Sequence, residues 1–434
     1  MRIIFFILLL AINAAVCNFA LANDISLQDE NSEFATRSCK LKQYIKHKTA
    51  LPADCRCGSN RSNSSGLNVC QRPTEVARNM GVNIGKGPSF ANYYNSRLTG
   101  GFIDYKNNEL IASVQWGSGK ESRGLIVAYD MSDWSRRFVS GDAQDEYGHH
   151  VIAKGPSFFK LKDVQAGKDG YWYGFSHEQV KGGGLRILQI DPKTGERKLI
   201  WAGRDNSYGQ CPSGRKIVRN DSQKYVQYTQ EAFAVDPSNG SFLLTFSNNK
   251  MGGTGIARIS SDGSTCNFVT LSGSRDDNLK VGRGFDLRGP MLGLYIHAGK
   301  IFTHSSGEKT FYEIDPNNGN RKALARKGPK PPAWRRVAWD EERKVFWVSG
   351  KMNSVSIAAF DPAKKKYLIA HKSCGKKFPW AWYPLCMGGP IRINSLNYGP
   401  MWLNKKTGNL LFGQDLIGIV EFEPSTGNSI NRSF

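Results

Sequence analysis

The chain has 434 residues, and 59 Lys and Arg against 37 Asp and Glu give it a formal net charge of +22. A hydrophobic content of 40% is enough to build a packed core, while 46 glycines indicate many tight turns and exclude a fold of long helices. The positive charge favours anionic partners. The basic residues are scattered and do not interleave with aromatic residues, which excludes specific nucleic-acid recognition.

Residues 1–22 predict a secretory signal peptide. Arg2 supplies a short basic region, an apolar run follows, and Ala20-Leu21-Ala22 fits a cleavage site before Asn23. The apolar run is interrupted by Asn13 and is shorter than the roughly 18 residues that a membrane-spanning helix needs. We therefore expect a secreted or periplasmic protein without a transmembrane segment.

Residues 23–98 are rich in cysteine and are expected to form a separate N-terminal segment. Eight cysteines remain after removal of the signal peptide, and an even number in an exported chain indicates disulfides. Four of them lie between residues 39 and 70. Cys374 and Cys386 could close a loop, and Cys211 and Cys266 would be the remaining pair.

From residue 99 to residue 434 the sequence repeats one pattern of four short apolar segments separated by polar turns. The turn between the third and fourth segments is the clearest marker, because proline presets φ, aspartate binds the backbone ahead of it and glycine adopts the left-handed conformation. The best examples are Asp191–Gly195, Asp315–Gly319, Asp361–Ala363 and Glu423–Gly427.

Six such units align, which predicts a six-bladed β-propeller over residues 99–434. The alternative all-β fold, a pair of β-sandwiches, would explain the strands but not the repeated unit. The pentapeptide KGPSF occurs at residues 86–90 and again at 154–158. The repeat predicts that each copy leads into a blade, or that the first belongs to a strand that closes the ring.

Polar residues recur where the second strand of each unit ends and the first strand begins. In a propeller these positions open on one face, so we expect the side chains to converge at one mouth of the central channel. They are Trp116, His177, Asn248, His304, Lys351 and Asp415 at the strand ends, and Glu231, Arg288, Trp334, Arg335 and Arg336 at the strand starts.

Three functions fit this ring. In the first, Arg288, Arg335, Arg336 and Lys351 bind an anionic ligand such as an acidic glycan, and Trp116 and Trp334 are stacking platforms. In the second, the protein is a hydrolase or an acidic-sugar lyase with His177 or His304 as general base. For the hydrolase, Glu231, Asn248 and Asp415 would bind a divalent cation. In the third, the protein is a scaffold for protein interactions. We expect a monomer in each case.

The repeated units resemble the six-bladed, calcium-dependent propellers of the gluconolactonase and paraoxonase type. The segment Glu231–Pro237 is similar to the glutamate, short strand and turn that open a blade in that family. The resemblance implies a lactonase or esterase-like hydrolase and makes Glu231 a candidate calcium ligand. The family's Pro-Asn-Gly stretch has no counterpart here. The pair His149-His150 lies in an acidic stretch that we interpret as a surface loop.

Overall fold

The structure is a computed structural model. It describes residues 96–117, 122–145, 148–177, 185–203, 232–248, 253–273, 280–287, 291–305, 310–324, 334–351, 355–372, 400–413, 418–422, 424 and 429–433. The predicted signal peptide, almost all of the cysteine-rich segment and the first KGPSF copy lie outside these residues. So do all cysteines except Cys266, and the disulfide pattern therefore stays a prediction.

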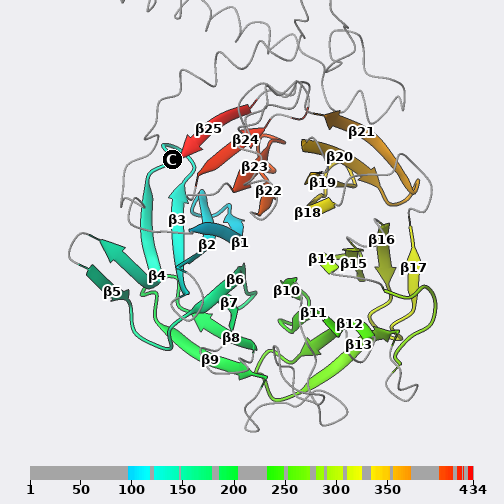
Figure 1. Ribbon diagram of the computed structural model, residues 1–434, viewed down its shortest axis with the longest axis horizontal. Coiled ribbons are helices and arrows are strands. Elements are labelled where there is room, and N and C mark those ends of the chain that lie inside the picture. Colours follow the sequence, from blue (N-terminus) through cyan, green and yellow to red (C-terminus); the bar gives the residue numbers. More distant parts are fainter. Residues whose placement is uncertain are drawn as a thin grey trace, which may run out of the picture.

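The described chain forms six antiparallel sheets arranged as blades around an axis, which confirms the predicted six-bladed β-propeller (Figure 1). Blade 1 contains β1 (Arg97–Asp104), β2 (Glu109–Trp116), β3 (Arg123–Asp130), β4 (Arg136–Asp145) and β5 (Gly148–Ile152). Blade 2 contains β6 (Phe159–Ala166), β7 (Trp172–His177), β8 (Leu185–Ile190) and β9 (Arg197–Ala202). Blade 3 contains β10 (Phe233–Val235), β11 (Phe242–Asn248), β12 (Gly253–Ile259) and β13 (Cys266–Ser272).

The second half of the ring follows the same plan. Blade 4 contains β14 (Met291–His297), β15 (Lys300–Ser305), β16 (Thr310–Ile314) and β17 (Arg321–Ala323). Blade 5 contains β18 (Trp334–Asp340), β19 (Val345–Lys351), β20 (Val355–Asp361) and β21 (Lys366–Lys372). Blade 6 contains β22 (Met401–Leu403), β23 (Leu410–Gly413), β24 (Ile419–Phe422) and β25 (Ser429–Ser433). The first strand of each blade is the innermost (Figure 1).

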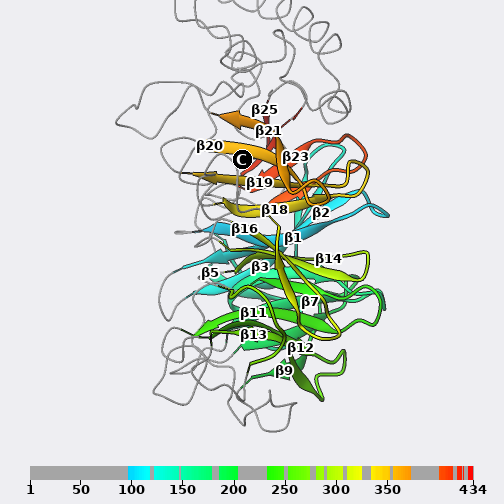
Figure 2. The same ribbon diagram turned by 90° about the vertical axis from the view of Figure 1, so that its right-hand side faces the viewer.

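In the side view, the strands of the blades run from one face of the ring to the other (Figure 2). The turns between first and second strands and between third and fourth strands therefore share one face, which we call the hairpin face. The predicted turn chemistry is present there. Asp191 accepts a hydrogen bond from the Lys193 N–H at 2.7 Å, and Gly195 has a φ of 73°. Asp315 and Gly319 repeat this arrangement in blade 4.

The hydrophobic core is divided into clusters that lie between neighbouring blades. One cluster packs Ile111 and Ile126 of blade 1 against Phe158 and Leu188, which belong to the start of blade 2 and to β8. Similar clusters join the other neighbouring pairs, except that none is described between blades 5 and 6. Each blade is therefore stabilised mainly by burying its apolar faces against its neighbours, as radial packing of sheets requires.

The second KGPSF copy is held by an arginine from its own blade. Arg197, at the start of β9, donates from its guanidinium to the backbone carbonyls of 152, 153, 155 and 156, and to Ser140 Oγ at 2.7 Å. Arg321 occupies the same place in blade 4 and binds four carbonyls and Thr270 Oγ1. These two arginines fasten the segments that lead from blade 1 to blade 2 and from blade 3 to blade 4.

The interpretation of His149-His150 as a surface loop is wrong. Both residues lie on β5, which pairs with β4 through Gln144 and Ala143. The sequence repeat predicts four strands per blade. The fifth strand of blade 1 comes from the segment that leads to blade 2, and the repeat does not predict it. Among the described residues, no helix is long and apolar enough to cross a membrane.

Candidate functional site

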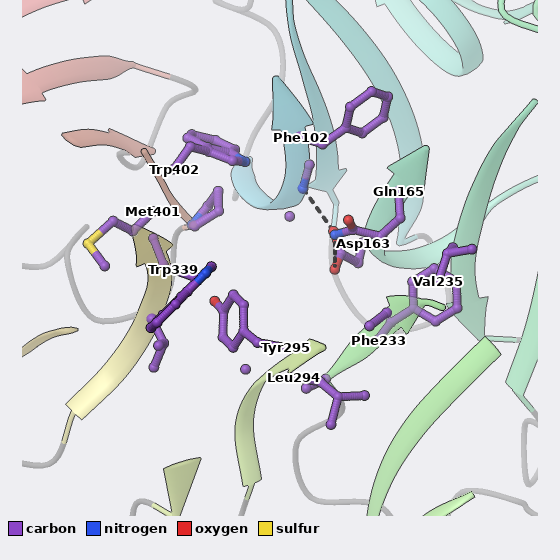
Figure 3. Close-up of a pocket in the computed structure, with 18 of the residues that line it drawn as sticks. Phe102, Asp163, Gln165, Phe233, Val235, Leu294, Tyr295, Trp339, Met401 and Trp402 are labelled. Carbon is purple, nitrogen blue, oxygen red and sulfur yellow. Dashed lines mark hydrogen bonds between the residues drawn. The ribbon is translucent and has the colours of Figure 1, made fainter. Parts of the chain in front are cut away.

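A cavity of about 560 Å³ occupies the axis of the propeller and is lined by the first strands of all six blades. Figure 3 shows two different walls. Trp402, Met401, Trp339 and Tyr295 lie on one side, and Asp163 and Gln165 lie on the other with Phe233 and Val235. Blades 4 to 6 therefore give the cavity an aromatic wall. Blade 2 gives the opposite wall its polar side chains.

Strand register explains how residues far apart in the sequence meet here. In every blade, the second strand contains a Ser, Thr or Gly. The residue directly before it pairs with one residue of the first strand, and this first-strand residue marks an equivalent position in all six blades. These positions form an inner ring, which consists of Gly101, Asp163, Phe233, Tyr295, Val337 and Met401. Two residues further along each strand, on the same side and nearer the hairpin face, lies a mouth ring of Ile103, Gln165, Val235, His297, Trp339 and Leu403.

Asp163 is the only carboxylate among the described residues that line the cavity. Its Oδ1 accepts hydrogen bonds from the backbone N–H groups of Gly101 and Val164, both at 2.8 Å, and its Oδ2 accepts one from Gln165 Nε2 at 3.0 Å. A Cβ atom placed on Gly100 would lie 1.9 Å from Asp163 Oδ1. Gly100 of β1 therefore makes room for this side chain, which bridges blades 1 and 2.

The position of Asp163 gives it an unusual titration. Its enclosure raises its pKa to about 7, because removal from water disfavours the ionised carboxylate more than its three hydrogen bonds favour it. Burial and the negative charge of Asp163 both raise the pKa of Tyr295 well above its ordinary value. Near neutral pH, Asp163 can thus donate or accept a proton, whereas the Tyr295 hydroxyl stays protonated.

The aromatic wall is fixed by packing within and between blades. Tyr295 packs on Phe346 with ring centroids 5.9 Å apart, and Trp339 packs on the same ring at 4.5 Å. At the rim, Tyr105 donates from its hydroxyl to the Leu403 carbonyl at 2.9 Å, and Lys405 lies over the Tyr105 ring. Lys162 and Lys405 are the cations among the described lining residues.

Three predicted site residues lie in the interior of the blades. His177 is the last residue of β7 and His304 the second-last of β15, and they are 1% and 0% exposed. Burial lowers the pKa of His304 to about 3, and its ring packs edge-on against Phe311. Trp116 is also buried and donates from Nε1 to the Asp142 carbonyl at 2.9 Å. These placements favour packing roles over those of general base and stacking platform.

The other predicted residues can be followed only in part. The backbone places Trp334, Arg335 and Arg336 at the start of β18 beside the end of β19, where Lys351 lies. Asn248 ends β11. Glu231, Arg288 and Asp415 lie outside the described residues, so the proposed calcium ligands stay a prediction. Within the described ranges, no group of three or more His, Cys, Asp or Glu side chains is arranged to hold a metal ion.

The sequence-based site missed the residues of the two walls. Asp163, Tyr295, Trp339 and Trp402 lie within or near the ends of first strands, whereas the prediction concentrated on the opposite face. One signal was available. Asp163 interrupts the apolar pattern of β6, and an acid within a predicted inner strand must face either the axis or a partner.

No protein-family model and no curated protein matches the chain. Among solved structures, a gluconolactonase from Xanthomonas campestris is similar with a TM-score of 0.42 at 13% identity, over 76% of this chain and 87% of that chain. A provisional gluconolactonase gives a TM-score of 0.44 at 13% identity, over 80% and 93% of the two chains. A Bacteroides thetaiotaomicron protein of unknown function gives 0.45 at 12% identity, over 78% and 74%.

Proposed function

We propose that the axial channel binds a small ring-shaped ligand that carries an anionic group, such as an acidic monosaccharide. The observation that carries this proposal is the pair of facing walls in one cavity. The aromatic wall offers flat surfaces to a ring, and Asp163 and Gln165 offer hydrogen bonds to its edge. A volume of about 560 Å³ is in the range of small-molecule sites.

The charges favour an anion over a cation. Lys162 and Lys405 contribute to the lining, and the net charge of +22 attracts anions from a distance. Asp163 would oppose an anion only when ionised, and its enclosure already favours the protonated form. Binding should therefore tighten as the pH falls through 7, because a bound anion and a protonated Asp163 stabilise each other.

Isothermal titration with three monosaccharides of equal size tests this proposal. Glucuronate, glucose and glucosamine present anionic, neutral and cationic forms of the same ring. We expect glucuronate to bind most tightly and to weaken between pH 6 and pH 8. Equal affinities at pH 6, where glucosamine is cationic, or a preference for glucosamine at that pH, would contradict the anionic ligand.

Variants locate the site. Trp339→Ala should weaken glucuronate binding by about tenfold, since a lost stacking contact is worth about 1.4 kcal/mol. Lys405→Ala should weaken it less, and Lys193→Ala is the matched control because Lys193 is an exposed lysine on another turn of the hairpin face. Unchanged affinity in Trp339→Ala would exclude the channel as the binding site.

Hydrolysis of a cyclic ester is the second candidate, and the near-neutral pKa of Asp163 favours it. A carboxylate that titrates near pH 7 suits a general base that activates water. Hydrolysis of glucono-1,5-lactone, followed with a pH indicator, tests this function in the wild type and in Asp163→Asn. Calcium and a chelator, with Glu231→Gln, test the calcium-dependent form. Wild-type rates no higher than the uncatalysed rate would remove this candidate.

A further inference from the structure

In the aromatic wall, the indole N–H of Trp339 donates a hydrogen bond to a charged side chain. Its Nε1–H donates to Glu341 Oε2 at 2.5 Å. The His297 ring lies against the indole with centroids 4.4 Å apart, and His297 Nδ1 is 3.1 Å from the same carboxylate oxygen. Two side chains thus hold one indole, one through its N–H and one through its face.

We propose that Glu341 and His297 are positioning residues that fix the plane of Trp339 at the mouth of the channel. Their effect on a ligand rests on the function proposed above. Their effect on Trp339 itself does not, because the contacts exist without a ligand.

The contacts join two blades. His297 is the last residue of β14 in blade 4, and Glu341 follows β18 in blade 5. His297 and Trp339 occupy equivalent places in the mouth ring, so neighbouring first strands bring them side by side. Glu341 then closes the set from the turn that follows Trp339. The orientation of the indole is therefore determined by the junction of blades 4 and 5 as well as by its own strand.

Glu341 is suited to this role over a wide range of pH. Hydrogen bonds from Lys344 and Trp339 lower its pKa to about 2, so it remains an ionised acceptor in ordinary buffers. About half of its side chain is exposed, and exposed ion pairs contribute little to stability. Replacing Glu341 should consequently leave the free energy of unfolding nearly unchanged. A shift of the Trp339 indole signal or a change in ligand affinity would then report the position of the indole.

The indole ¹H–¹⁵N signals of the full chain provide the test. Trp339→Phe identifies the signal among those of 10 tryptophans. Glu341→Ala should shift this signal and speed its exchange with solvent, whereas Glu341→Gln, which keeps an acceptor oxygen, should restore both. Glu342→Ala is the matched control, because it removes the same charge from the neighbouring position of the same turn. An unshifted signal in Glu341→Ala, or an equal shift in Glu342→Ala, would overturn the proposal.

His297 is tested in the same way. His297→Ala removes the ring against the indole and should shift the Trp339 signal, and His297→Phe should keep it near the wild-type position. If glucuronate binds the wild type, Glu341→Ala should raise its Kd severalfold and Glu341→Gln should not. If glucuronate does not bind, the proposed function fails, and the indole signals still decide whether Trp339 is positioned by these two residues.

Discussion

The junction of blades 1 and 2 combines apolar packing with hydrogen bonds between the blades, whereas aromatic rings fill the junction of blades 4 and 5. At the first junction, Asp163 accepts from Gly101 and Thr99 donates to the Leu161 carbonyl at 2.9 Å. At the second junction, Phe311 of blade 4 stacks on Phe360 of blade 5 with centroids 4.6 Å apart. Each junction also supplies one wall of the channel.

The difference shows how one repeated unit produces a channel with two unlike sides. A hydrogen-bonded junction depends on donors and acceptors that must all be satisfied, and its carboxylate responds to pH. An aromatic junction depends mainly on shape and volume. We therefore expect the two walls to fail under different perturbations, and the following substitutions separate them.

Removing one ring from the aromatic junction should have the largest effect. Phe346 is fully buried and contacts Tyr295, Trp339, Phe302 and Phe311. Phe346→Ala should lower the free energy of unfolding by about 3–5 kcal/mol, because it leaves a cavity as well as removing apolar contact. Urea unfolding measures this loss, and Phe346→Leu should cost much less. A loss below about 1 kcal/mol would show that this junction is not packed as described.

Breaking the polar junction should lower the free energy of unfolding slightly less than Phe346→Ala does. Arg197→Ala would leave four carbonyls and Ser140 without the guanidinium that binds them, and we expect a loss of about 2–4 kcal/mol. Arg137→Ala is the control, since Arg137 is an exposed arginine whose ion pair with Glu109 should contribute less than about 1 kcal/mol. Equal effects of the two substitutions in urea unfolding would contradict the role of Arg197.

The fold could be predicted from the sequence because its signals are local. The turn at Asp191–Gly195 needs only residues within five positions, and its chemistry repeats in blade 4 at Asp315–Gly319. Counting such turns gives the number of blades. The strand β5 escaped this count because it belongs to a segment between units and contains no marker of its own.

The candidate site could not be predicted in the same way, because its properties arise from neighbours that are distant in sequence. Asp163 titrates near neutrality because burial outweighs its hydrogen bonds, one of which comes from Gly101, 62 residues away. His304 shows the same dependence on distant neighbours. A histidine near the end of a strand suggested a general base at the channel mouth, and the surrounding strands bury it completely. Burial depends on the packing of whole blades, which strand patterns do not specify.

Replacing Asp163 should change how stability depends on pH. The folded-state pKa of about 7 is above the ordinary value of 3.8, so protonation of Asp163 stabilises the folded state. This stabilisation is complete below pH 4 and is lost as the pH rises through 7. Asp163→Asn removes the titration and keeps an oxygen acceptor. We expect the variant to gain about 1–3 kcal/mol over the wild type at pH 8 and little at pH 4, since one pKa unit corresponds to about 1.36 kcal/mol. Parallel pH profiles in urea unfolding would contradict this.

The junction that closes the ring, between blades 6 and 1, gives the smallest expected effect. Tyr105 Oη donates to the Leu403 carbonyl and accepts from the Lys405 N–H, both at 2.9 Å, so one hydroxyl links the two ends of the described ring. Tyr105→Phe keeps the aromatic side chain and removes only the hydroxyl. It should lower the free energy of unfolding by about 1 kcal/mol, the usual contribution of such hydrogen bonds. Amide exchange should quicken at Lys405 and be unchanged at Arg197. If exchange instead quickened equally at both residues, the closing junction would control the whole ring, and the independence of the two walls would have to be abandoned.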